Sequence, residues 1–145
     1  MDTTKKLTRT IILNAKPSEI WEILTNPDMT KKYMFSCEAH SSWKVGSEIK
    51  WKGNFQGYES GEKGTILEIV QNRRLKYSSI DPNFGIEDIP ENYLHVTYDL
   101  VQENGHIELS IIIENFNSDP NRIENIAKAW DNMVIPAIEN IFNGN

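Results

Sequence analysis

Residues 119–142 read DPNRIENIAKAWDNMVIPAIENIF and contain the longest helical apolar repeat of this 145-residue chain. Apolar residues recur there at steps of three and four, which places them along one face of an α-helix. A helix over this whole stretch is about 36 Å long, at ~1.5 Å per residue. Its apolar face must be covered by another layer of the protein. The rest of the chain therefore has to provide a broad apolar surface.

Two features of this stretch predict its local geometry. Asp119 and Pro120 suit the N-cap and the first helical position, so the helix is expected to begin there. Pro136 lies inside the helical pattern, where a proline removes one backbone hydrogen bond and predicts a bend of the axis.

Most of the chain before this helix has the pattern of β-strands. Over residues 48–55, Ile49, Trp51 and Phe55 alternate with polar residues, as in a strand with one buried face. Asn104 and Gly105 favour a hairpin turn between two later strands. In addition to 48–55, strands are expected at residues 7–13, 65–70, 75–80, 94–101 and 107–114, and two short helices around residues 20–24 and 28–33.

The order of these elements predicts one α+β domain over residues 1–145. Strands that are grouped together, with the long helix after them, do not fit a βαβ repeat. A long helix held in a curved antiparallel sheet tends to enclose a cavity. The predicted function therefore depends on what occupies the space between the helix and the sheet.

The composition argues against several functional classes. The net charge is −6, with 15 Lys and Arg against 21 Asp and Glu, so neither nucleic acid nor an anionic membrane surface is an expected partner. The first residues lack the apolar core of a secretory signal, and no apolar run has the length of a membrane span. Cys37 is the only cysteine, so no intrachain disulfide can form and a cytoplasmic location is expected.

Reactive side chains show no known catalytic or metal-binding motif. Cys37 lacks a base on the same face and is interpreted as a structural residue. His40, His95 and His106 lack zinc-ligand spacing and are interpreted as surface residues, although His95 and His106 could meet across a hairpin. Glu68 lies on an apolar strand, where an outward position is favoured over an inward acid–base role. No catalytic residue, metal or cofactor is expected.

Aromatic side chains are the more informative set. Large rings that carry a hydroxyl or an indole N–H are typical of small-molecule sites, although each of them could also fill the core. Taken together, they favour a cavity. The acidic segment 81–92 is expected to be a packed connection, with a lid over the cavity as the alternative. The predicted cavity lining consists of Tyr33, Trp51, Phe55, Ile66, Tyr77, Tyr98, Ile111, Ile113, Trp130 and Met133.

Four stretches, taken in order, resemble a known family. They are NAKPSEIWEILTNP at residues 14–27, WKVGSEIKW at 43–51, GTILEIVQNRRL at 64–75 and AWDNMV at 129–134. Each is a loose motif alone, but their order and spacing together are specific. The chain resembles the activator-of-heat-shock-protein-90-ATPase-like family of the START-like superfamily, which is related to polyketide cyclases.

This resemblance implies the helix-grip fold, also called Bet v 1-like. In that fold, six or seven antiparallel strands curve around a long C-terminal helix, two short helices follow the first strand, and an internal cavity lies between helix and sheet. The resemblance does not imply one chemistry, because the fold hosts carriers, receptors, cyclases and co-chaperones.

Three hypotheses for function remain. The preferred one is a non-enzymatic binder of a small hydrophobic or aromatic molecule, since no catalytic group is evident. The second is a chaperone-associated or stress-response interaction module. The third is a cyclase or hydrolase in which Glu68, His95 or a tyrosine acts as the acid–base group. The expected oligomeric state is a monomer or a homodimer.

Overall fold

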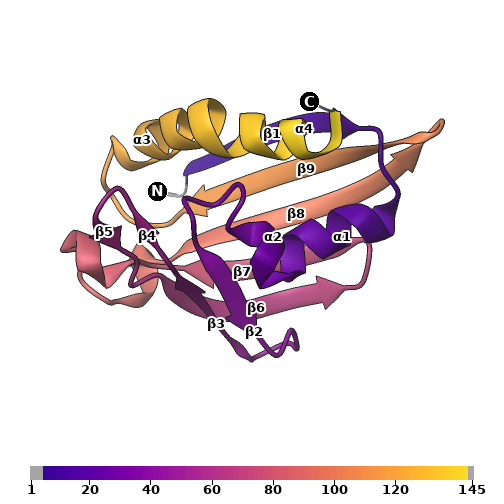
Figure 1. Cartoon of the computed structure of the whole chain (residues 1–145). Helices are drawn as coiled ribbons and strands as arrows, with labels where there is room; N and C mark the ends of the chain where they lie inside the picture. Colours follow the sequence, from indigo (N-terminus) through magenta and orange to yellow (C-terminus); the bar gives the residue numbers. More distant parts are fainter. Residues whose placement is uncertain (1–4, 144–145) are drawn as a thin grey trace.

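The computed structural model describes residues 5–143 and shows a seven-stranded antiparallel sheet with helices packed on it (Figure 1). The strand order is β1-β9-β8-β7-β6-β3-β2, so the first strand pairs with the last one. The α+β helix-grip architecture predicted from the sequence is confirmed. The strands of this sheet are β1 (Lys5–Leu13), β2 (Glu38–Ser41), β3 (Glu48–Lys52), β6 (Lys63–Val70), β7 (Arg74–Ser79), β8 (Leu94–Glu103) and β9 (His106–Asn115).

Shorter elements close the two ends of the sheet. A hairpin of β4 (Asn54–Phe55) and β5 (Tyr58–Glu59) lies at the end opposite α1 in Figure 1, beside two single 3₁₀ turns. The helical elements are α1 (Pro17–Thr25), α2 (Pro27–Thr30), the 3₁₀ turns η1 (Pro82–Phe84) and η2 (Pro90–Asn92), α3 (Arg122–Ala129), the π-helical turn η3 (Trp130–Val134) and α4 (Ile135–Asn143).

The core lies between the C-terminal helix and the face of the sheet that it covers, which we call the inner face. Alternate residues of β9 are buried along its whole length, which is the period of a strand with one face on the core. Ile107, Leu109, Ile111 and Ile113 are each at most 1 % exposed. Each such side chain contributes about 1.5–3 kcal/mol when it leaves water, so this face holds the helix in place.

The C-terminal helix spans 22 residues without a break in the chain, but one turn is not α-helical. In η3 the N–H of Ile135 donates to the carbonyl of Trp130, five residues earlier. Pro136 follows directly, and it has no N–H to offer the preceding turn. The hydrogen bond that Pro136 cannot make is therefore accommodated by a wide turn just before it, and the bend of the axis stays a prediction.

Two local predictions need correction, and one strand was missed. The last helix begins at Arg122 with Asn121 as its N-cap, because the Asp119 carboxylate accepts a hydrogen bond from the Asn121 N–H at 2.9 Å and holds a turn there. The second short helix ends at Thr30. Strand β2 was not predicted, because its four residues contain only one apolar side chain, too few to show an alternation.

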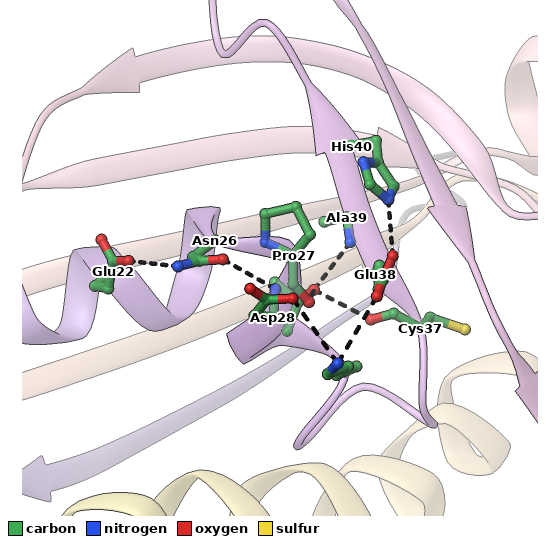
Figure 2. A network of polar contacts seen from close by, with 10 residues as sticks. Glu22, Asn26, Pro27, Asp28, Cys37, Glu38, Ala39 and His40 are labelled. Carbon is green, nitrogen blue, oxygen red and sulfur yellow. Dashed lines mark hydrogen bonds and ion pairs between the residues drawn. The ribbon is translucent and has the colours of Figure 1, made fainter.

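A network of polar contacts connects α2 to β2 (Figure 2). Thr30 is fully buried, and its Oγ1 donates to the Cys37 carbonyl at 3.1 Å and accepts from the Ala39 N–H at 2.9 Å. In the same view Asn26 joins Glu22 to the Asp28 backbone, and Glu38 contacts His40. This network holds the edge strand against the short helices.

Replacing Thr30 by valine is expected to lower the free energy of unfolding by about 1–3 kcal/mol, because the buried Ala39 N–H loses its acceptor while the shape is kept. Urea denaturation measures this loss. The matched control is Thr8→Val on the exposed side of β1, where we expect a change within about 0.5 kcal/mol. Equal effects at the two positions would contradict the assigned role of the Thr30 hydroxyl.

Candidate functional site

Four buried aromatic rings form a line across the inner face, which we call the aromatic row. It runs from Trp51 on β3 through Tyr77 on β7 and Tyr98 on β8 to Trp130 on the C-terminal helix. Successive ring centroids are 5.6, 6.3 and 6.3 Å apart, and the ring planes are tilted to one another by 38–45°. Strand pairing therefore brings together residues that are far apart in the sequence.

Strand alternation explains why these rings point inward. Trp51 shares its face of β3 with Ile49, and Tyr98 shares its face of β8 with Val96 and Leu100, all of which are buried. Tyr77 lies opposite Val96 in the β7–β8 pair. The rings are thus fixed by the same pattern that builds the core.

Two polar atoms of the aromatic row have no partner of good hydrogen-bond geometry within residues 5–143, although the Tyr77 hydroxyl lies close enough to that of Tyr98 to influence its pKa. The two atoms are the indole Nε1 of Trp51 and the hydroxyl of Tyr98, whose residues are 3 % and 1 % exposed. By contrast, the hydroxyl of buried Tyr33 donates to the Ile23 carbonyl at 2.8 Å. An unsatisfied buried polar group costs about 1–3 kcal/mol. A bound molecule with an acceptor near these atoms would remove that cost.

A carboxyl group lies at the β3 end of the row. Glu62 directly precedes β6. It is two and four residues before Gly64 and Ile66, which are buried, so strand alternation places its side chain on the inner face. Its backbone carbonyl accepts from the Trp51 N–H at 3.0 Å, which makes the two residues cross-strand neighbours. The hydroxyl of Ser79 donates to the Glu62 carboxyl.

The surroundings of Glu62 favour its protonated form. Burial raises its pKa to about 7; the Ser79 hydrogen bond acts in the opposite direction, and the nearby Asp81 charge adds to the rise. Burial also raises the pKa of Tyr77 and of Tyr98 well above the usual range, so both keep neutral hydroxyls. Glu62 is therefore the group of this site that changes charge near neutral pH.

Asp81, in contrast, is well satisfied. Its carboxylate accepts from the Tyr58 hydroxyl at 2.9 Å, from the Gly61 N–H at 3.2 Å and from the Asn83 N–H at 3.0 Å. The Phe84 ring stacks on Tyr58 at 4.6 Å between centroids. These contacts hold the β5–β6 connection and η1 together beside Glu62.

Polar contacts hold the segment 81–92 against the sheet. This agrees with the packed connection expected from the sequence. Asp88 pairs with the Nζ of Lys63 at 2.6 Å and accepts from the Tyr93 hydroxyl at 2.6 Å. The Asn92 amide donates to the Glu87 carbonyl at 2.8 Å. These contacts attach the segment to β6 and to the start of β8.

Eight of the ten predicted lining residues are buried, and two need comment. Phe55 is half-buried on β4 and packs edge-on against Phe35 at 5.4 Å, outside the aromatic row. Met133 is 44 % exposed, so its placement in the lining is wrong. The wide turn η3 advances by more residues than an α-helical turn, which brings Val134 and Ile135 inward instead. The buried residues are Tyr33, Trp51, Ile66, Tyr77, Tyr98, Ile111, Ile113 and Trp130.

The other candidates lie outside the site. Glu68 is exposed and faces Arg74 and Lys76 at 3.6 and 3.9 Å, so the outward position is confirmed. His95 pairs with Glu114 and His106 with Glu103, at opposite ends of the β8–β9 pair, so the two imidazoles do not meet.

The two remaining reactive side chains also lack a catalytic setting. The His40 ring contacts Glu38 at 3.0 Å on the surface. Cys37 is buried, which raises the pKa of its thiol. Within residues 5–143, no group of three or more His, Cys, Asp or Glu is placed to hold a metal ion.

Glu62 was missed by sequence reasoning. It stands between Gly61 and Lys63 in a glycine-rich stretch that has the composition of an exposed turn. The spacing of four residues between Glu62 and Ile66, which puts both on one face of an extended strand, is the one signal that could have indicated an inward position.

Two open grooves lie on the described residues away from the aromatic row. One, of about 510 Å³, lies between α1 and the end of α4, with Ile23, Met29 and Phe142 in its wall and Glu22 beside them. The other, of about 570 Å³, lies near the β6–β7 and β8–β9 turns. The enclosed cavity between helix and sheet stays a prediction.

Comparison with known proteins gives a family and a set of similar folds. The family described as Activator of Hsp90 ATPase homolog 1-like protein matches residues 14–143. Among curated proteins, none matches this chain. In residues 5–143, no helix has the length and apolar character needed to cross a membrane.

Three solved structures illustrate the similarity. A solution structure from Cytophaga hutchinsonii is 31 % identical over 94 % of this chain and 92 % of its own, with a TM-score of 0.78. An HSP90 activator from Plasmodium falciparum is 17 % identical over 94 % of both chains, with a TM-score of 0.72. An Aha1 dimer from Colwellia psychrerythraea is 16 % identical over 95 % of this chain and 96 % of its own, with a TM-score of 0.74. At such low identity, the last two show a shared fold alone.

Proposed function

This chain belongs to the Activator of Hsp90 ATPase homolog 1-like protein family, and we propose that it binds a small aromatic or hydrophobic molecule at the aromatic row without transforming it. The observation that carries the proposal is that Trp51 Nε1 and the Tyr98 hydroxyl, buried on a face lined mainly by apolar side chains, have no partner of good hydrogen-bond geometry among residues 5–143. Rings provide the apolar contact area, while the two polar atoms fix the orientation of the guest.

Binding has to open space between the sheet and the helix, because the rings pack closely. Trp130 is the ring we expect to move, since it starts the wide turn η3 and is the one member of the row on the helix. Such π-helical turns are frequent at functional sites. The guest would then lie beside Tyr98 and Trp51, where an oxygen acceptor can satisfy the hydroxyl and the indole N–H.

The test is an NMR chemical-shift titration of the labelled protein with 2-phenylethanol and with acetophenone as probes. We expect saturable shifts at residues of the aromatic row. Trp51→Phe and Tyr98→Phe keep a ring but remove the polar atom, so each should weaken binding about tenfold, the value of one hydrogen bond of ~1.4 kcal/mol.

The matched control is Tyr93→Phe, which removes a hydroxyl that contacts Asp88 outside the row. Its affinity should equal that of the unchanged protein. Absence of saturable shifts with both probes, together with no added mass in native mass spectrometry, would overturn the proposed function.

The relatives suggest partners that do not depend on this site. One is described as an HSP90 activator and another as a dimer, so a chaperone and a second copy of this chain are further proposed partners, in a cytoplasmic setting. Pull-down with an HSP90 homologue and sedimentation equilibrium measure them. Trp51→Phe should leave both results unchanged, which separates these partners from the small-molecule site.

A further inference from the structure

We propose that the molecule held at the aromatic row carries a basic nitrogen, positively charged at neutral pH, which pairs with the carboxylate of Glu62. This inference rests on the proposed function and names the chemical class of its ligand. Three observations on the described residues support it: the position of Glu62, the lack of a cationic partner, and the neighbouring rings.

The position of Glu62 places its carboxyl at one end of the aromatic row. Its backbone bonds to that of Trp51, and the two side chains leave neighbouring strands on the same face. The charge of Glu62 also contributes to the raised pKa of Tyr77 and of Tyr98, which are the next two members of the row. A ligand lying along the row would therefore reach this carboxyl.

The lack of a cationic partner makes this carboxyl unusual. Among residues 5–143, no Lys or Arg nitrogen lies within ion-pair distance, 4.0 Å, of Glu62. Its one side-chain partner is the neutral hydroxyl of Ser79. A half-buried carboxylate is costly unless it is paired, and a ligand cation would supply the missing charge.

The titratable groups around Glu62 increase this demand for positive charge. Asp81 is an acid, and its own oxygens are occupied by Tyr58 and two backbone N–H groups. Cys37, Tyr58, Tyr77 and Tyr98 are the groups whose pKa the charge of Glu62 helps to raise, and none of them is a cation. The adjacent Lys63 directs its Nζ to Asp88, at 2.6 Å. An anionic ligand would be repelled at this end of the row.

The neighbouring rings complete a site for an organic cation. Trp51 and Tyr77 lie 5.6 Å apart beside Glu62, and the face of an aromatic ring attracts an ammonium group. A protonated amine can thus contact a carboxylate and an aromatic face together, while its apolar part follows the row toward Tyr98 and Trp130. An uncharged ligand of the same shape keeps the apolar contacts along the row but cannot form the ion pair with Glu62.

The experiment compares three probes of similar size, namely 2-phenylethylamine, 2-phenylethanol and 3-phenylpropionate, by NMR titration at pH 6 and pH 8. At pH 8 we expect the amine to bind about tenfold more tightly than the alcohol, and the carboxylate least well. A carboxyl with a pKa of about 7 is mostly neutral at pH 6 and mostly ionised at pH 8. Amine affinity should therefore rise up to about tenfold between these values, whereas alcohol affinity should not.

Two variants identify the group responsible. Glu62→Gln should reduce the preference for the amine over the alcohol to about one and remove its pH dependence. Glu59→Gln deletes the same charge from an exposed position on β5 nearby and should keep both. Equal binding of amine and alcohol, or an amine preference that survives in Glu62→Gln, would overturn this inference while leaving the proposed function intact. Failure of all three probes to bind would overturn both.

Discussion

Replacing Glu62 by glutamine is expected to stabilise the protein at pH 8 by as much as about 3 kcal/mol, with almost no effect at pH 4. The reason is the rise of the Glu62 pKa from 4.5 to about 7 on folding, mainly through burial. Each pKa unit corresponds to about 1.36 kcal/mol. The substituted glutamine would keep a neutral side chain of similar shape and could not ionise.

The direction with pH follows from linkage. Because the folded-state pKa lies above the unfolded value, the folded protein holds this proton more tightly. Stability from this group is complete below pH 4.5, declines as the pH rises, and is lost above about pH 7. The difference between the variant and the unchanged protein should therefore grow from pH 4 to pH 8.

Urea denaturation at unit steps from pH 4 to pH 8 measures this difference, with Glu59→Gln as the control. Glu59 is exposed, so its replacement should give a small difference that does not vary with pH. A flat profile for Glu62→Gln would mean that Glu62 ionises normally in the folded protein. An ionised Glu62 lowers the stability of the folded protein at physiological pH. Such a cost is expected where a carboxylate serves to bind a ligand.

Replacing Trp130 by alanine is expected to lower the free energy of unfolding by about 3–5 kcal/mol, since it removes a large buried ring and leaves a space that the wide turn cannot collapse into fully. Trp130 is 8 % exposed and is the ring that connects the helix to Tyr98. The space left behind is apolar and has the shape of an indole ring.

Added indole should partly restore this loss, by about 1.4 kcal/mol at ten times its Kd. Thermal unfolding with and without indole measures the rescue. Trp43→Ala is the matched control, because Trp43 is half-buried in the turn after β2 and lies outside the row. It should destabilise less and show no rescue. Equal behaviour of the two variants would contradict a ligand-accessible space at Trp130.

Much of the fold could be predicted from the sequence, because the relevant signals are local. The alternation in residues 107–113 and the Asn104-Gly105 turn predicted β8, β9 and their pairing, and the structure confirms both. The long apolar repeat predicted the C-terminal helix. Since a sheet and a helix with apolar faces must cover each other, these two predictions together imply the architecture.

The helix also shows where local reasoning stops. Met133 and Val134 are both expected on the face of an α-helix that contains Trp130, yet one is 44 % exposed and the other is fully buried. The difference arises from the wide turn η3, in which Ile135 takes the inward place. Pro136 indicated that the hydrogen bonding would be irregular, but not which register would result.

The candidate site depended almost wholly on tertiary structure. The sequence by itself determined which residues are apolar, where the strands alternate and that one long helix needs a covering layer. Only the folded chain brought Glu62 beside Trp51 and Ser79 and left two polar atoms of the aromatic row without partners of good hydrogen-bond geometry among the described residues. The physical reason is that hydrophobic periodicity is a property of neighbouring residues, whereas the burial of a carboxyl group and its pKa depend on side chains that strand pairing brings from distant segments.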